Sequence, residues 1–198
     1  MVRPPTKDPA RHRRGLIGNV SEGMSCDDVV EAYWPKDLFE QGIGWVFIAR
    51  IKGGGRKAVV SVFLVDVLCR GVKQAHHEVC DPEFYRRRIR DHYLSEFEME
   101  RIEPGRALAL VEQAVRYAMD LGLAPDAGYE KASRIFRQIP ATSSSERFVF
   151  GRDGKPFYRS GPRETESDAR KVVEQLARRC GVGNFHYIVA LDDPSALK

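Results

Sequence analysis

The sequence lacks the short motifs that mark the common nucleotide-dependent and metal-dependent enzymes. It has no glycine-rich nucleotide-binding signature, no nucleophile elbow around a serine, no paired CxxC zinc motif and no HExxH helix. No reaction can therefore be assigned from a motif alone. Any function has to be inferred from clusters of side chains and from the distribution of charge.

Long apolar runs and closely spaced cysteines are also missing. No window reaches the roughly 18 consecutive apolar residues of a transmembrane helix, and the N-terminus shows no apolar core of a secretory signal. The four cysteines are scattered along a chain of 198 residues, which is long enough to bury a core without crosslinks, so reduced thiols are favoured over disulfides. We therefore expect a cytoplasmic protein without a membrane partner.

The net charge of +4 is concentrated in one short segment. Residues 1–14 carry five basic side chains against Asp8, whereas the basic and acidic side chains of the remaining chain balance. This segment has too few apolar residues to fold by itself, so we predict a disordered basic tail over residues 1–14 and a single domain over residues 15–198. Arg11, Arg13 and Arg14 are candidate contacts to nucleic-acid phosphates, and a purely solubilising terminus is the alternative.

Apolar periodicity predicts a chain of helices and strands without internal repeats. The expected helices are a short one between the Ser25 cap and Pro35, one from the Asp81 cap to Glu96, and others over 104–121, 127–138 and 169–180. The expected strands are 44–51 and 58–68, joined by a glycine turn, then a hairpin of 148–150 and 156–158 around Asp153-Gly154, and finally 185–190.

This order of elements predicts an α+β fold. Regular βαβ alternation is absent, so we expect a mixed or mainly antiparallel sheet, built from two hairpins plus a C-terminal strand, with helices packed mainly on one face. A doubly wound parallel sheet with a nucleotide crevice is not indicated.

Two overlapping metal sites can be considered near the end of the second strand. Cys69, His76 and Cys80 could ligate zinc, although free cysteines are more often simply buried. Asp66 with its neighbours could instead hold magnesium or manganese for a nuclease or hydrolase reaction; the neighbours concerned are His76, His77, Glu78 and Asp81. The alternative for Asp66 is a salt bridge to Arg70 or Lys73, or a cap for the turn after the strand.

The expected second hairpin interleaves basic and aromatic residues. Such a ribbon could contact phosphates and stack on bases, through Arg152, Lys155, Tyr158, Arg159 and Arg163. It could also be an ordinary hairpin that exposes its charges and buries its aromatic rings.

These observations favour a non-catalytic accessory module that binds nucleic acid, or a nucleoprotein complex, through the basic tail and this hairpin. The metal-dependent nuclease or hydrolase centred on Asp66 is the first alternative. A protein-protein interaction domain, whose arginines meet an acidic partner, is the second.

Overall fold

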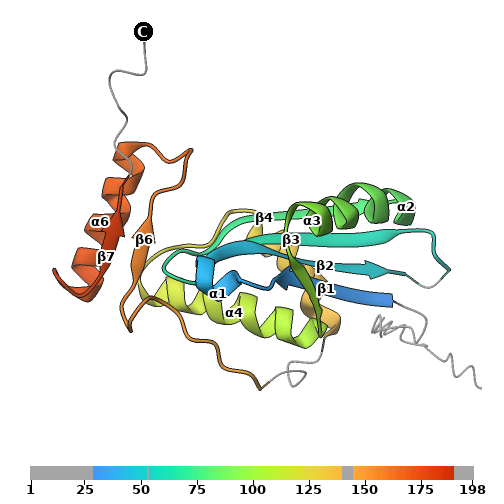
Figure 1. Ribbon diagram of the computed structural model, residues 1–198, viewed down its shortest axis with the longest axis horizontal. Coiled ribbons are helices and arrows are strands. Elements are labelled where there is room, and N and C mark those ends of the chain that lie inside the picture. Colours follow the sequence, from blue (N-terminus) through green and yellow to red (C-terminus); the bar gives the residue numbers. More distant parts are fainter. Residues whose placement is uncertain (1–28, 53, 140–144, 190–198) are drawn as a thin grey trace, which may run out of the picture.

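The computed structural model describes residues 29–52, 54–139 and 145–189. Five strands form an antiparallel sheet in the order β4-β3-β2-β1-β5, and two further strands form a small parallel sheet, β6-β7 (Figure 1). The strands are β1 (Val29–Pro35), β2 (Ile43–Ile51), β3 (Ala58–Asp66), β4 (Gly71–Cys80), β5 (Met99–Ile102), β6 (Phe157–Arg159) and β7 (His186–Ile188). The α+β class is confirmed.

Helices flank the large sheet and the small one. They are α1 (Leu38–Gln41), α2 (Pro82–Phe84), the π-helical turn η1 (Tyr85–Arg90), α3 (Asp91–Glu96), α4 (Pro104–Asp120), α5 (Tyr129–Ala132), the 3-10 helix η2 (Ser133–Gln138) and α6 (Glu166–Cys180). Within the described ranges, α4 is the longest helix, and neither it nor any other helix has the length and apolarity that a bilayer crossing needs.

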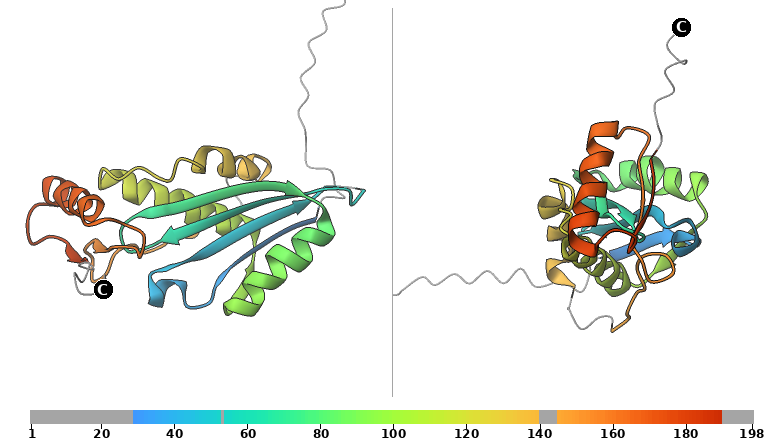
Figure 2. Two further views of the ribbon diagram at one scale, coloured as in Figure 1. Left: turned by 90° about the horizontal axis from the view of Figure 1, so that it is seen from above. Right: turned by 90° about the vertical axis from the view of Figure 1, so that its left-hand side faces the viewer.

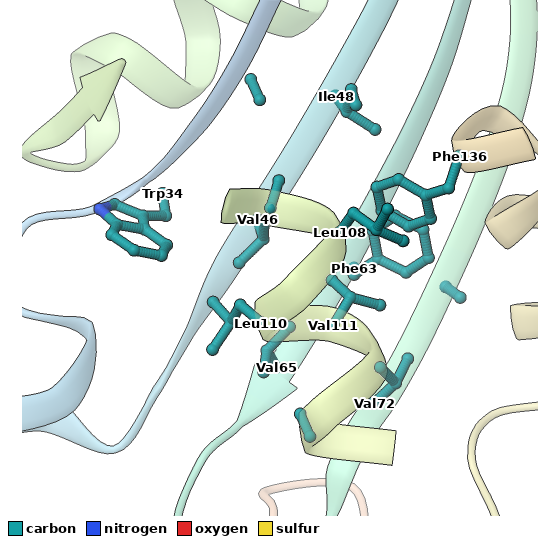
Figure 3. Close-up of a cluster of buried hydrophobic side chains, with 14 of the residues drawn as sticks. Trp34, Val46, Ile48, Phe63, Val65, Val72, Leu108, Leu110, Val111 and Phe136 are labelled. Atoms are coloured by element: carbon teal, nitrogen blue, oxygen red, sulfur yellow. The ribbon is translucent and has the colours of Figure 1, made fainter. Parts of the chain in front are cut away.

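One face of the large sheet is closed by α4 together with α5 and η2. Val46, Ile48, Phe63 and Val65 of the central strands pack there against an apolar stripe of α4, which includes Leu108, Leu110 and Val111 (Figure 3). The ring of Phe63 also stacks on Phe136 of η2, with 5.5 Å between the ring centroids. This interdigitated layer is the main core of the protein.

The opposite face is covered by the continuous helical segment α2-η1-α3, so the sheet lies between two helical layers (Figure 2). The Asp81 carboxylate caps this segment, as the sequence predicts, by accepting a hydrogen bond from the Glu83 N–H at 2.7 Å. Tyr85 is fully buried against Phe47 and Val60.

The segment expected to form the first helix is strand β1 instead, from Val29 onwards; residues before it lie outside the described part. Side chains alternate along it, because Ala32 and Trp34 face α4 whereas Tyr33 packs on the other face. The strand pairs with β2 on one side and β5 on the other. Pairing on both edges, together with β-branched and aromatic residues, outweighs the local capping signal.

The expected second hairpin is only a turn. Asp153 and Gly154 have positive φ angles of 52° and 75°, and Arg152 and Lys155 exchange backbone hydrogen bonds of 2.8 and 3.0 Å. No strand forms over 148–150, where Phe150 stacks on Tyr117 of α4 with the ring centroids 5.1 Å apart. The other arm, β6, pairs in parallel with β7, so neither belongs to the large sheet.

The C-terminal part of the described chain is fastened to the turn after β3. The N–H of Phe157 donates to the Leu68 carbonyl at 3.0 Å, and that of Gly151 donates to the Val67 carbonyl at 2.9 Å. These bonds bring residues 159–164, which run from the end of β6 toward α6 and are called the loop 159–164 below, close to the β2-β3-β4 end of the sheet. Figure 1 shows β6 and α6 at this end.

Candidate functional site

The sheet face that carries α2-η1-α3 is covered only in part. Toward the beginning of β2 and the end of β3, the side chains of Trp45 and Leu64 are half-buried instead of sealed by helix. A groove of about 930 Å³ lies over them. Its walls come from β2, β3, β4, α3 and the loop 159–164, through Ile43, Trp45, Leu64, Asp66, Arg70, Lys73, Gln74, His76, Tyr93 and residues 159–164.

The floor of the groove combines a row of strand side chains with neighbouring aromatic rings. Trp45 lies opposite Leu64, and Leu64 lies opposite Gln74, so these three side chains form a row across β2, β3 and β4. The Trp45 ring is 6.5 Å from the His76 ring and 6.0 Å from the Tyr93 ring, measured between centroids. Flat rings held side by side in this way provide surfaces on which a ligand ring can stack.

A β-bulge in β4 directs a lysine side chain toward this groove. Gln74 pairs with Leu64 and Val72 pairs with Val65, which leaves Lys73 as the extra residue of β4. Bulges commonly re-aim a side chain, and here Lys73 and its neighbour Gln74 both line the groove.

One carboxylate is clamped between two cations at the groove wall. Glu164 accepts from Arg70 at 2.9 Å and from Lys73 at 3.3 Å, and all three side chains are largely buried. Burial by itself would raise the pKa of Glu164, but the Gly161 N–H and the charges of Lys73 and Arg70 together hold that pKa below its usual value. Glu164 is therefore ionised at neutral pH and fixes both cations in place.

Two further arginines stand at the rim. Arg159 and Arg163 are both exposed and both line the groove. A guanidinium group of Arg159 donates to the Gln41 carbonyl at 2.6 Å, which uses one of its several donors and holds the side chain over the groove. Among the described residues, the lining thus contains four cationic side chains against two carboxyl groups, of which Asp66 is buried.

Asp66 acts as a cap for the turn after β3, which was one of its expected roles. Its Oδ1 accepts hydrogen bonds from the Leu68 N–H at 2.9 Å and the Cys69 N–H at 3.0 Å. Burial raises the pKa of Asp66, and these hydrogen bonds oppose the rise. Its Oδ1 is thus occupied by two backbone N–H groups.

The structure does not bring the expected metal ligands together. His76 and His77 point to opposite faces of β4. Cys69 lies in the turn before β4 and Cys80 is the last residue of the strand, so a strand roughly 30 Å long at the usual rise per residue separates them. Burial raises the pKa of the Cys69 thiol to about 12, which disfavours the thiolate that zinc requires.

Glu78 and Asp81 follow farther along β4 and beyond it, away from Asp66. In the described ranges no three His, Cys, Asp or Glu side chains are placed to hold a metal ion. The residues expected to ligate a metal are therefore spread along and beyond an extended strand and do not form a cluster in the described part of the chain.

The basic residues of the expected hairpin are divided between two places. Arg159 and Arg163 line the groove, whereas Arg152 lies over the Phe157 ring at 4.5 Å and the Lys155 ammonium donates to the Gly183 carbonyl at 3.1 Å. Tyr158 is fully buried, so its ring cannot stack on a base. Arg11, Arg13 and Arg14 lie outside the described residues.

Several groove residues escape prediction from the sequence. Trp45 and Tyr93 look like core residues at apolar positions, and Arg70 and Lys73 are expected only as partners of Asp66. The tryptophan at the start of an apolar strand is the one signal that could have indicated a surface for stacking.

Comparisons with protein-family models, with the sequences of curated proteins and with solved structures find no match for this chain. The groove itself is thus the basis for a functional proposal.

Proposed function

We propose that the protein is a non-catalytic module that binds single-stranded nucleic acid in the groove over Trp45. The observation that carries this proposal is the combination of an aromatic floor with a cationic rim on one open sheet face. Unpaired bases stack on aromatic side chains whatever their sequence, while Lys and Arg follow the backbone phosphates. A duplex hides its base faces, so a single strand suits this surface better.

The dimensions and charge of the groove agree with this ligand. Its volume of about 930 Å³ lies near the upper end of the range for small-molecule sites, and it is large enough to receive a base with its sugar and phosphate. Arg159 and Arg163 are exposed and can meet phosphates directly, whereas Arg70 and Lys73 are fixed by Glu164 and contribute a positive field. The basic tail is a second expected contact, through Arg11, Arg13 and Arg14.

The test is fluorescence anisotropy with short labelled single-stranded RNA and DNA at low and moderate salt. The double variant Arg159→Gln, Arg163→Gln removes the rim charges. We expect it to bind about tenfold more weakly than the unmodified protein at low salt, with a shallower dependence on salt because fewer counterions are released.

The matched control is the double variant Arg152→Gln, Lys155→Gln. It removes the same charge from the same segment but from residues that do not line the groove. Its affinity should stay within about twofold of the unmodified protein, apart from long-range screening effects. An equal loss of affinity in both variants would mean that the whole basic segment 152–163, and not the groove, determines binding. If the protein binds neither RNA nor DNA, the interaction with an acidic protein partner would be favoured.

A truncation that removes residues 1–14 measures the contribution of the tail. Each lost phosphate contact should reduce the logarithmic salt slope by about 0.7 for a single strand. An unchanged slope would show that the tail does not contact the strand.

A further inference from the structure

The carboxylate of Glu164 lies among several hydrogen-bond donors in the wall of the groove. Its Oε1 accepts from Nη1 of Arg70 at 2.9 Å, and its Oε2 accepts from Nζ of Lys73 at 3.3 Å and from the Gly161 N–H. All of these residues line the groove, and the Glu164 side chain is 20% exposed. The donors therefore come within reach of a ligand in the groove once the Glu164 carboxylate moves aside.

Glu164 leaves part of the hydrogen-bonding capacity of these donors unused. In the described part of the chain, Nε of Arg70 is buried without a partner, so the guanidinium group holds the carboxylate through one nitrogen. The Tyr158 hydroxyl is buried and has no partner there at full hydrogen-bond geometry, and burial and the nearby charge of Glu164 raise its pKa to about 12. A tetrahedral phosphate has more acceptor oxygens than a carboxylate, and arginine frequently binds it with two nitrogens. Phosphate therefore suits this arrangement better than Glu164 does.

The glycine at position 161 makes room for an anion beside the backbone. A Cβ atom there would lie 3.1 Å from Oε2 of Glu164 and 3.4 Å from Nζ of Lys73, and the first of these distances is closer than most side chains tolerate. Because Gly161 has no side chain, its N–H can approach the oxygen of an anion closely.

The exchange of Glu164 for a ligand requires only the rotation of one side chain. Residues 161–164 form a turn in which the Glu164 N–H donates to the Gly161 carbonyl at 3.1 Å. Pro162 occupies the second position of this turn, where its fixed φ angle is favourable. Neither feature involves the Glu164 carboxylate, so the Gly161 N–H keeps its place when that carboxylate leaves.

These donors lie beside the floor on which a base can stack, since Lys73 directly precedes Gln74 of the floor. We propose that Arg70, Lys73 and the Gly161 N–H form a phosphate subsite of the groove, which the Glu164 carboxylate occupies in the free protein and vacates when a phosphate binds. The inference rests on the proposed function for its ligand, because the bound strand supplies the phosphate.

The test is two-dimensional NMR of the full chain during titration with pyrophosphate, which has no base to stack. In the unmodified protein we expect saturable shifts of the Gly161 and Lys73 amides, with weak affinity because the ligand has to displace Glu164. Glu164→Gln removes the competing charge and should bind pyrophosphate at least about tenfold more tightly, since hydrogen bonds between charged groups are strong. The dispersion of each spectrum shows whether the variant is folded.

Glu166→Gln is the matched control. Glu166 lies in the first turn of α6, meets Arg170 at 3.1 Å and does not line the groove, so this variant removes the same charge two residues away. Its affinity for pyrophosphate should stay within about twofold of the unmodified protein. The double variant Glu164→Gln, Lys73→Gln should lose the tenfold gain. Equal affinities of Glu164→Gln and Glu166→Gln, or saturation without a shift at Gly161, would overturn the proposal.

Failure of this proposal and failure of the proposed function give different results. If pyrophosphate shifts Gly161 but the protein binds no single strand, the phosphate subsite is supported, its ligand is a small phosphorylated molecule, and strand binding is refuted. If anisotropy detects strand binding but neither the strand nor pyrophosphate shifts Gly161, the subsite is refuted and the proposed function stands.

Discussion

The two faces of the large sheet are alike in sequence but differ in how completely they are covered. On the α4 face, the strand residues of the core, such as Phe63 and Val65, are fully buried. On the other face, α2-η1-α3 seals Phe47 and Val60 but leaves Trp45 and Leu64 half-buried, although Tyr93 of α3 lies beside the Trp45 ring. An apolar strand pattern on both faces therefore does not imply burial on both faces. A ligand can bind where the helices leave part of the sheet face uncovered.

The largest effect should come from comparing two adjacent residues of β3. Phe63→Ala removes a fully buried ring that stacks on Phe136, and it should lower the free energy of unfolding by about 4 kcal/mol. Leu64→Ala, one residue later on the groove face, should lower it by only about 1 kcal/mol because the side chain is half-buried. Urea denaturation gives both values. Equal losses would mean that the groove face is as closed as the α4 face.

Asp66 provides the next test, because it caps the turn at the base of the groove. Asp66→Ala leaves the Leu68 and Cys69 N–H groups without their acceptor and should lower the free energy of unfolding by about 2 kcal/mol. Asp66→Asn keeps an acceptor oxygen and should lower it by less.

The pH dependence of this effect has a defined sign. Burial raises the pKa of Asp66 in the folded state, so the unmodified protein should gain stability relative to Asp66→Asn as the pH falls toward the unfolded pKa of about 3.9. Urea denaturation over this pH range measures the difference. A difference that stays constant with pH would contradict burial of the charged group.

Glu164→Gln tests the electrostatics of the groove. It removes the one negative charge that pairs with Arg70 and Lys73, so single-stranded nucleic acid should bind more tightly, with a salt slope steeper by about 0.7 for each additional phosphate that the groove neutralises. The variant should also be less stable at neutral pH. Because the folded pKa of Glu164 is lowered, the stability advantage of the unmodified protein should disappear as the pH falls through that pKa. Weaker binding by Glu164→Gln would show that affinity depends on Glu164 holding Arg70 and Lys73 in position more than on the net charge of the groove.

The smallest effect concerns His77 on the opposite face. Its folded pKa is lowered, so protonation disfavours the folded state, and the protein should lose stability as the pH falls below the unfolded pKa of about 6.5. His77→Asn can keep the hydrogen bond to Ser61 without titrating, and it should abolish this part of the pH profile. Thermal melts between neutral and mildly acidic pH measure the difference. Identical profiles for the two proteins would contradict the environment assigned to His77.

The sequence predicts the local features of this fold well. The strands β2 and β3, the Asp81 cap and helix α4 follow from apolar periodicity and capping residues. Helix α6 is confirmed as well, although it begins earlier than expected. These elements are determined by residues close together in the chain.

The errors arise where distant segments decide the structure. The polar strand β4 and the short strand β5 gain their conformation from pairing partners, and β6 pairs with β7 instead of closing a hairpin. The groove has the same origin, since it needs a β-bulge at Lys73 and a loop from residues 159–164 beside a strand that begins at Ile43. No local pattern records such a combination.

The most direct test of the binding groove uses the two tryptophans of the chain. Trp34 is 4% exposed on the α4 face, so a Trp34→Phe protein reports on Trp45 alone. On titration with a short unlabelled single strand, the emission of Trp45 should be quenched saturably, and the midpoint should move to higher concentration as salt is added. Strand binding detected by anisotropy without any change in Trp45 emission would contradict a groove in which bases stack on this ring.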